Sequence, residues 1–204
     1  MARPREFDEA AVLDAAVQCF WARGYEATSV RDLAEQMDIA GASLYNAFGD
    51  KRALFLRALR SYVEQGVLDR IARLEGRLPP RQAIAAFFDE IVERSLSDKQ
   101  RKGCLLVNSA LEVAPHDPEF RRVIADVLVE TEAFFRRCAA AGQRAGTIAA
   151  SQSPEDLARL LLGVLLGIRV LARARPERAL LQGLMRPVLA LLDPDPNRKE
   201  PNAK

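Results

Sequence analysis

Residues 28–51, TSVRDLAEQMDIAGASLYNAFGDK, carry the pattern that most restricts the fold of this chain. Apolar residues recur there at the spacing of two short helices, one on each side of a bend at residues 37–39. The first set is Val30, Leu33, Ala34 and Met37, and the second is Ile39, Leu44, Tyr45 and Phe48. Two short helices with these faces can bury them against a shared core, so the stretch predicts a helix-turn-helix motif.

The residue types also place the ends of these helices. Thr28 or Ser29 is suited to cap the first helix. Asp38 lies at the bend, where aspartate tolerates the left-handed backbone conformation better than most residues other than glycine. Ala40 has no side-chain oxygen that could cap the second helix. We therefore expect that helix to begin near Gly41 with backbone amides free for water or a phosphate.

The segment from Phe20 to Phe55 resembles the DNA-binding segment of the tetracycline-repressor (TetR) family of transcriptional regulators. The matching residues are Phe20, Gly24-Tyr25, Thr28 to Ala34, Ser43-Leu44-Tyr45, Phe48, and Lys51 with Ala53-Leu54-Phe55. The resemblance implies that the second helix of the motif enters a DNA groove and that a larger helical ligand-binding domain follows. Two positions depart from the family's usual pattern. Asp38-Ile39-Ala40 stands where Gly-Val-Ser is usual, and Asn46 stands where a histidine is usual.

Ten residues are candidates for contact with a double-stranded DNA operator. Tyr45 resembles the family's phosphate-contacting tyrosine, although it also fits a core position. Lys51 follows Asp50 at a helix start, where a phosphate would offset the unfavourable helix dipole; a solvated surface lysine is the alternative. Small side chains at residues 40–43 let the helix backbone approach the bases. The full set is Thr28, Ser29, Arg31, Ala40, Gly41, Ala42, Ser43, Tyr45, Asn46 and Lys51.

Overall charge does not by itself indicate DNA binding. The chain has a formal charge of +2, and residues 1–60 hold eight basic and nine acidic side chains. Residues 39–60 differ, because their charged side chains are Lys51, Arg52, Arg57 and Arg60 against Asp50 alone. We expect the attraction to DNA to come from this patch, doubled by dimerisation. Arg3 and Arg5 form a short N-terminal arm that either reaches the DNA or is disordered.

Length and composition fit a DNA-binding module followed by a larger packed domain. The 204 residues are 49% hydrophobic and include 11 glycines, without a polar low-complexity tract. The N-terminal residues lack the apolar core of a signal peptide, and the longest strongly apolar run, residues 160–168, is too short to span a bilayer. We therefore expect a cytoplasmic protein that binds no membrane.

The remainder of the chain also has helical periodicity. We expect helices over about residues 8–23, 51–75, 81–96, 102–113, 118–141, 154–174 and 177–192. No segment alternates convincingly with period two, so the predicted fold is all-α. The predicted organisation is a three-helix DNA-binding domain at 1–50, a helical ligand-binding and dimerisation domain at 51–192, and a disordered tail at 193–204.

The last two predicted helices are apolar around most of their circumference. Such helices need burial on nearly all sides, which a second copy of the chain or an internal sandwich can provide. Gly163 and Gly167 permit close backbone approach at a seam between copies. The predicted homodimer contacts are Leu161, Gly163, Val164, Gly167, Ile168, Leu184 and Val188. A four-helix dimer interface, which the family resemblance also implies, would present two recognition helices to a near-palindromic operator.

The middle helices are the place where the family resemblance implies a pocket for a small-molecule effector. The candidate pocket residues are Phe87, Phe88, Ile91, Cys104, Leu106, Val127, Thr131, Phe134 and Phe135. Ordinary core packing explains each of them equally well. As a hypothesis, an apolar effector wedges these helices and moves the recognition helices until they no longer fit the operator, which makes the chain a repressor.

Cys104 offers an alternative form of regulation. Arg101 and Lys102 precede it near a helix start, and both features favour a reactive thiolate, as in a redox or electrophile sensor. A buried helical cysteine is the other interpretation. Three cysteines do not indicate a disulfide framework, and the single histidine, His116, gives no metal motif. No cofactor is expected.

Two other classes of protein compete with a regulator. The sequence has no phosphate-binding glycine loop, nucleophile elbow or paired-histidine motif, so an enzyme is not predicted. Carboxylates such as Glu90 and Glu112 could still serve a helical enzyme, or lie on the surface. A helical adaptor that binds protein rather than DNA is the third class.

Overall fold

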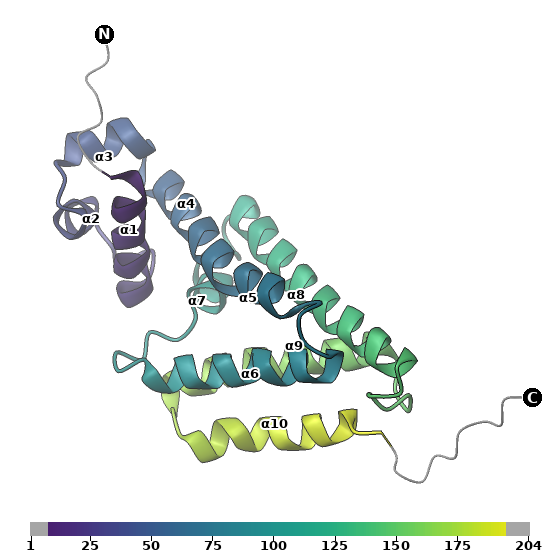
Figure 1. The fold of residues 1–204 in the computed structure, drawn as a ribbon. Coiled ribbons are helices and arrows are strands. Elements are labelled where there is room, and N and C mark those ends of the chain that lie inside the picture. The colour runs from purple at the N-terminus through teal and green to yellow at the C-terminus, as the bar shows by residue number, and fades with distance from the viewer. Residues whose placement is uncertain (1–7, 195–204) are drawn as a thin grey trace, which may run out of the picture. The chain divides into compact units, whose positions relative to one another are not determined.

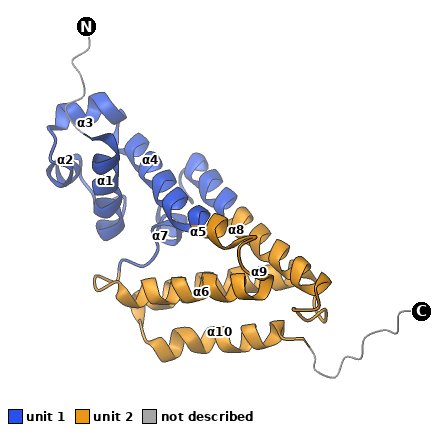
Figure 2. Cartoon of the chain, viewed as in Figure 1, with its two compact units in different colours: residues 1–69, 102–127 blue, residues 70–101, 128–204 orange. Residues whose placement is uncertain are grey.

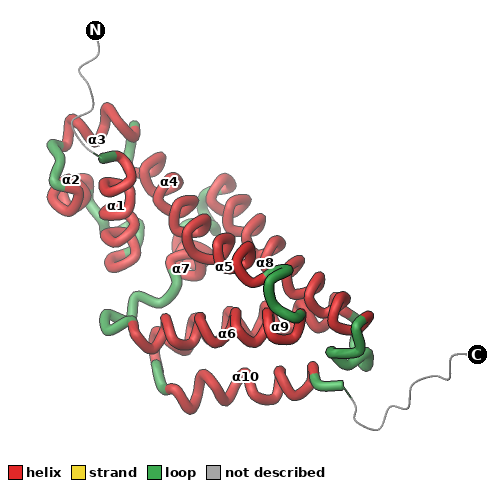
Figure 3. The backbone as a smooth tube through the Cα atoms, in the orientation of Figure 1, coloured by secondary structure: helices red, strands yellow, loops and turns green. Residues whose placement is uncertain are grey.

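A computed structural model describes residues 8–194, and every regular element in this range is a helix (Figures 1 and 3). The all-α prediction is therefore confirmed. The predicted arm residues Arg3 and Arg5, and residues 195–204 of the predicted tail, lie outside the described residues. No helix in the described range is both long and apolar enough to cross a membrane.

The chain divides into two compact units, which are coloured in Figure 2. Unit 1 contains residues 1–69 and 102–127, and unit 2 contains residues 70–101 and 128–204. This division differs from the expected boundary at residue 50, because residues 51–69 and 102–127 group with the N-terminal helices. Helix α8, Pro118–Arg144, supplies residues to both units.

Unit 1 begins with three short helices whose ends follow local chemistry. Helix α1, Glu9–Arg23, is capped by Asp8 and ends at Gly24, whose φ of 87° is accessible mainly to glycine. Helix α2, Val30–Met37, begins with a capping box between Ser29 and Asp32. Asp38 then adopts the left-handed conformation, with φ 52° and ψ 44°, as predicted. Helix α3, Gly41–Phe48, begins after Ile39 and the N-cap residue Ala40.

Aromatic rings hold these helices against the rest of unit 1. Phe55, on helix α4 (Lys51–Val63), lies with its ring centroid 4.6 Å from Phe20, 4.9 Å from Tyr25 and 5.2 Å from Phe120. Helix α7, Leu105–Glu112, packs against α4. The N-terminal helices therefore share one core with residues from the second half of the sequence.

The predicted single helix over residues 51–75 is one helical run with a change of winding. Helix α4 passes into a π-helical turn, η1 (Glu64–Leu68), and then into helix α5 (Asp69–Leu74). A π-helical turn changes the direction of the following side chains without ending the helix. Periodicity alone did not reveal this change.

Unit 2 is a helical bundle. Helices α6 (Pro80–Ser97), α9 (Pro154–Ala174) and α10 (Arg178–Leu192) pack against one another. Four phenylalanine rings form the centre of this unit, with neighbouring centroids 5.2–6.1 Å apart. They belong to α6 and to the second part of α8, and are Phe87, Phe88, Phe134 and Phe135.

Candidate nucleic-acid interface

Helix α3 has one packed face and one open face. Leu44 and Phe48 are buried at 0% and 5% exposure, whereas Tyr45 is 51% exposed. Ala42 and Asn46 are also exposed, and residues 42, 45 and 46 share a helix face because they are three and four positions apart. The packing of α3 is therefore complete without the phenol, amide and methyl groups that it presents outward. This arrangement is what a helix needs in order to enter a DNA groove.

The N-terminus of α3 is open in the way the sequence predicts. Ala40 is the N-cap residue and gives no side-chain cap, while its carbonyl accepts bonds from the amides of Ser43 and Leu44 at 2.9 and 3.1 Å. A Cβ atom added to Gly41 would meet nothing within 4 Å. The amides of Gly41 and Ala42 make no hydrogen bond to the described residues, and a phosphate there is favoured by both hydrogen bonding and the helix dipole.

Two further candidates stand at the start of α2. The Ser29 hydroxyl accepts a bond from the Asp32 amide at 3.1 Å, so its cap role is established within the chain. Arg31 has an 87% exposed side chain, and its Nε donates to Glu35 at 2.8 Å. An exposed pair of this kind is weak and can open toward a phosphate.

The side chains of Thr28 and Lys51 make bonds within the chain. Thr28 is 1% exposed, and its hydroxyl donates to the Gly24 carbonyl at 2.5 Å. The Lys51 ammonium donates to the carbonyls of Tyr25 and Thr28 at 3.0 and 3.1 Å and lies 4.3 Å from the centre of the Tyr25 ring. Both side chains hold the turn between α1 and α2.

The predicted basic patch at residues 39–60 is also largely engaged inside unit 1. Arg52 donates to Asp117 at 2.6 and 3.0 Å and to Glu119 at 2.8 Å. Arg57 pairs with Glu9, and Arg60 lies 3.8 Å from Glu119. Carboxylates far away in the sequence thus neutralise much of the expected attraction to DNA.

Sequence reasoning missed a brace that ties α7 and α8 to the DNA-binding helices. The brace consists of Glu112, Asp117, Glu119 and Phe120. The Glu112 carboxylate accepts bonds from the backbone amides of Tyr25 and Glu26 at 3.1 and 2.9 Å. A Cβ atom at Gly24 would lie 3.0 Å from this carboxylate, so Gly24 also makes room for it. Glu112 lies 87 positions from Tyr25 and 86 from Glu26, so no local signal in the sequence could reveal these contacts.

We predict that Glu112→Ala destabilises the DNA-binding helices. The substitution removes the acceptor for two backbone amides, which costs about 2 kcal/mol and lowers the Tm by roughly 4–8 °C. Thermal unfolding followed by circular dichroism measures the change. Leu111→Ala is the control, because Leu111 is 74% exposed and its loss should have little effect. Equal Tm values for both variants would show that the brace contributes nothing.

We predict that the Arg52–Asp117 pair makes stability depend on acid pH. Hydrogen bonds from Arg52 lower the pKa of Asp117 from 3.8 to about 2. Because the pKa is lower in the folded chain, the stabilisation is present above about pH 4 and is lost as pH falls toward 2. The Tm difference between the native chain and Asp117→Asn should therefore shrink over this window. Asp32, whose pKa is also about 2 because of Ser29, titrates equally in both proteins. A difference that stays constant from pH 6 to pH 2 would contradict the prediction.

All nine predicted effector residues are buried within their own units. Their exposures range from 0% to 8%. The four phenylalanines of this set fill the centre of unit 2, as ordinary core packing predicts. Val127, Cys104 and Leu106 belong to unit 1. Burial alone does not separate pocket lining from core, so the pocket stays a proposal.

Cys104 is the N-cap residue of α7 and is 8% exposed. Its sulfur accepts a bond from the Tyr62 hydroxyl at 3.7 Å. The Lys102 ammonium, which was expected to favour a thiolate, instead donates to Gln18 at 2.9 Å and lies 4.4 Å from the Trp21 ring centre. The geometry does not favour the cysteine-sensor alternative.

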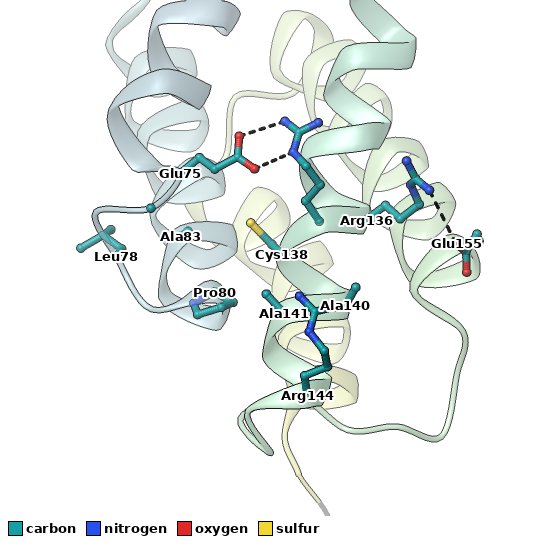
Figure 4. A pocket seen from close by; sticks show the side chains of 12 residues that line it. Glu75, Leu78, Pro80, Ala83, Arg136, Cys138, Ala140, Ala141, Arg144 and Glu155 are labelled. Atoms are coloured by element: carbon teal, nitrogen blue, oxygen red, sulfur yellow. Dashed lines mark hydrogen bonds and ion pairs between the residues drawn. The ribbon is translucent and has the colours of Figure 1, made fainter.

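Unit 2 has a surface hollow of about 540 Å³ between the start of α6 and the end of α8 (Figure 4). The Arg137 guanidinium donates to Glu75 at 2.6 and 2.9 Å at its edge. Burial raises the pKa of the Cys138 thiol in its wall to about 12, so this cysteine is protonated at neutral pH. None of the nine predicted effector residues lines this hollow.

The carboxylates considered for an enzyme are engaged in structural bonds. Glu90 accepts hydrogen bonds from Arg73 and Arg70. These bonds lower the pKa of Glu90, and the bond from Arg73 has the larger effect. A general acid at neutral pH needs the opposite shift. Among the described residues, no group of three or more His, Cys, Asp or Glu side chains is arranged to hold a metal ion.

The predicted dimer residues fall into two groups. Leu161 and Ile168 are 0% exposed and Val188 is 9% exposed, so their side chains belong to the bundle's own core and need correction as contacts between copies. Gly163 is exposed, while Val164, Gly167 and Leu184 are half-buried. An open apolar stripe on α9 does exist, and it consists of Leu160, Gly163, Val164, Gly167 and Val170.

Comparison with known proteins matches two parts of the chain to two family models. The family model described as bacterial regulatory proteins, tetR family, matches residues 12–58, which include the helix-turn-helix motif. A second model, tetracyclin repressor-like, C-terminal domain, matches residues 80–188, more than half of the chain. The chain belongs to the TetR family. Membership confirms the resemblance seen in the sequence and the expectation of a DNA-binding transcriptional regulator.

Individual TetR-family relatives agree. A solved cysteine mutant of the regulator CifR, complexed with 26-base-pair double-strand operator DNA, is 35% identical; the match covers 94% of this chain and 100% of that one, with a TM-score of 0.82. The transcriptional repressor ComR of Escherichia coli strain K12 is 29% identical over 90% of this chain and 86% of its own. An uncharacterized regulator of Bacillus subtilis strain 168, YezE, is 43% identical over 60% of this chain, and the match spans 63% of its length. All three are named as regulators of transcription.

Proposed function

We propose that the chain is a repressor that binds a near-palindromic operator as a homodimer and is released by a small-molecule effector. The observation that carries the proposal is the open face of α3, where Tyr45 is 51% exposed beside an uncapped helix N-terminus. The relative CifR, which shares the fold over nearly the whole chain, was solved on operator DNA. The protein acts in the cytoplasm, where its operator lies.

Each recognition helix contacts DNA through its open face and its N-terminus. Tyr45 donates its hydroxyl to a phosphate, and the amides at Gly41 and Ala42 bind another. Ser43 and Asn46 supply polar groups for base edges, while the small Ala40 and Ala42 allow close approach. Ser29 and Arg31 at the start of α2 add contacts to the sugar-phosphate backbone of the DNA.

The homodimer forms through α9 and α10. Leu160, Gly163, Val164, Gly167 and Val170 recur three or four positions apart on α9, so they form one apolar strip along the helix. Added Cβ atoms at Gly163 and Gly167 would meet nothing within 4 Å of the single chain. Glycine at open helical positions lowers helix stability, which is explained if a second copy packs closely there. Leu184 on α10 extends the contact.

Effector binding changes the spacing of the two recognition helices. The effector occupies unit 2 near Phe87, Phe88, Ile91, Thr131, Phe134 and Phe135. Helix α8 begins in unit 1, where Phe120 contacts Phe55 and Arg52 bonds to Asp117 and Glu119. A displacement of α8 is therefore passed to α4 and to the turn before α2, a two-state change that operator and effector bias in opposite directions.

Fluorescence anisotropy of a labelled fragment from the region upstream of the gene tests this function. The two phosphate contacts of each α3 make four per dimer, and the contacts of Ser29 and Arg31 add to them. Log affinity should therefore fall with log salt at a slope of about −4 or steeper, a loss of at least roughly 100-fold between about 50 and 200 mM salt. An enzyme or a protein-binding adaptor predicts no binding to this fragment. Binding that does not depend on salt, or an absence of binding even at low salt, would reject the proposal.

A further inference from the structure

Two arginines of unit 2 are buried, unlike the other described arginines. Arg70 on α5 is 5% exposed and Arg169 on α9 is 9% exposed. A guanidinium group keeps its charge at any physiological pH, so its burial is costly unless anions and hydrogen bonds compensate. The partners of these two groups therefore show whether the chain itself supplies the compensation.

Arg70 shares its carboxylate partner, Glu90, with Arg73. Its Nε donates to Glu90 at 2.9 Å, but Arg73 donates to the same carboxylate at 2.9 and 3.4 Å. The two terminal nitrogens of Arg70 make no hydrogen bond to the described residues. Its guanidinium carbon lies 5.4 Å from the centre of the Phe87 ring. One acid thus serves two arginines, and the open end of Arg70 lies beside the aromatic cluster.

Arg169 has no carboxylate partner within the described residues. Its Nη1 donates to the neutral Ser95 hydroxyl at 3.4 Å, a long bond that adds no negative charge. Burial is the main cause that lowers the pKa of Arg70, and the positive charge of Arg169 acts in the same direction. Both guanidinium groups also contact α6, Arg70 at the Phe87 ring and Arg169 at the Ser95 hydroxyl.

The terminal nitrogens of Arg70 are not completely sealed from solvent. Every fully inaccessible side-chain nitrogen or oxygen in the described part of the chain has a hydrogen-bond partner. The terminal nitrogens of Arg70, which have none, must therefore remain accessible although the residue as a whole is 5% exposed. Phe87, Ile91 and Ser95 are four positions apart on α6 and line the same helix face. This face of α6 therefore contacts Arg70 at Phe87 and Arg169 at Ser95.

We propose that Arg70 and Arg169 together bind the carboxylate of an organic acid whose apolar part packs against Phe87 and Ile91. The planar guanidinium group matches a carboxylate through paired hydrogen bonds, and aromatic neighbours favour an acid with an apolar body. This inference rests on the proposed function, since it names the chemical class of the effector.

The native chain and Arg169→Met are compared first without any ligand. Methionine keeps much of the length of the side chain and removes a buried charge that lacks an anionic partner. Its Tm should therefore rise by about 2–4 °C. Arg159→Met, at a 65% exposed position of the same helix, is the control and should change the Tm little. A Tm that falls in Arg169→Met would show a structural role for Arg169 and overturn the inference.

Ligand binding is then measured by thermal unfolding of the DNA-free protein. The probes are benzoate, phenylacetate and decanoate, each compared with its amide, and inorganic phosphate. At least one carboxylate should raise the Tm of the native chain and of Arg159→Met, while its amide should not. Arg169→Met should bind that acid at least tenfold more weakly, as expected for the loss of a charge-assisted hydrogen bond.

Three results would overturn the inference. They are no stabilisation by any carboxylate, equal stabilisation by acid and amide, and stabilisation by phosphate alone. Operator binding is measured separately on the same preparations without ligand. If all variants bind the operator and no acid binds, only the inference about the effector fails. If none binds the operator, the proposed function fails whatever the acids do.

Discussion

Tyr45→Ala is expected to reduce operator affinity by about 10²–10⁴-fold. The side chain is 51% exposed and lies on the open face of α3, so its loss removes one phosphate contact from each half of the dimer. A hydrogen bond to a charged group contributes about 1.5–3 kcal/mol, and the dimer makes this contact twice. Anisotropy titration of the labelled operator at fixed salt measures the loss.

Tyr45→Phe separates the two interpretations of this residue. If the hydroxyl binds a phosphate, the phenylalanine variant should lose most of the same affinity while the fold and Tm remain unchanged. If Tyr45 only packs, phenylalanine should restore native affinity. Unchanged operator binding by both variants would exclude α3 as the recognition helix in the orientation described.

Gly163→Leu combined with Gly167→Leu is expected to break the dimer and to weaken operator binding by about 10²–10⁴-fold. Leucine side chains would occupy the space where the backbone of the second copy approaches, and separate subunits lose the high effective concentration that links two half-sites. Sedimentation equilibrium measures the dimer, and anisotropy measures the operator.

The single chain should tolerate both leucines. Each Cβ position is open, and leucine favours a helix by nearly 1 kcal/mol over glycine. Asp89→Leu adds the same side chain at an exposed position of α6 and is the matched control. A doubly substituted chain that remains dimeric would place the interface elsewhere.

Local signals were sufficient to predict most of the helices. Helix periodicity, the Ser29 cap and the left-handed Asp38 all depend on residues within one or two turns of each other, and the structure has each of them. The π-helical turn at Glu64–Leu68 was missed because it leaves the apolar spacing nearly unchanged. Family resemblance predicted a division at residue 50, whereas residues 51–69 and 102–127 group with the N-terminal helices.

Long-range electrostatics could not be predicted in the same way. Lys51 was expected to meet a phosphate, but its ammonium binds carbonyls of Tyr25 and Thr28 that lie 26 and 23 positions away. Arg52 finds Asp117 at a separation of 65 residues. In the sequence these charges form a basic patch, whereas in the folded chain they have partners from distant segments. The same limitation applies to Arg169, whose burial no local pattern indicates.

A DNase I footprint of the region upstream of the gene tests the central claim most directly. Two copies of α3 held by the α9–α10 interface should protect one near-palindromic segment, with two half-sites centred about one helical turn apart. The Gly163→Leu, Gly167→Leu chain should lose this protection at the same protein concentration. Absence of a footprint with the native dimer, or protection of a single half-site, would contradict the account.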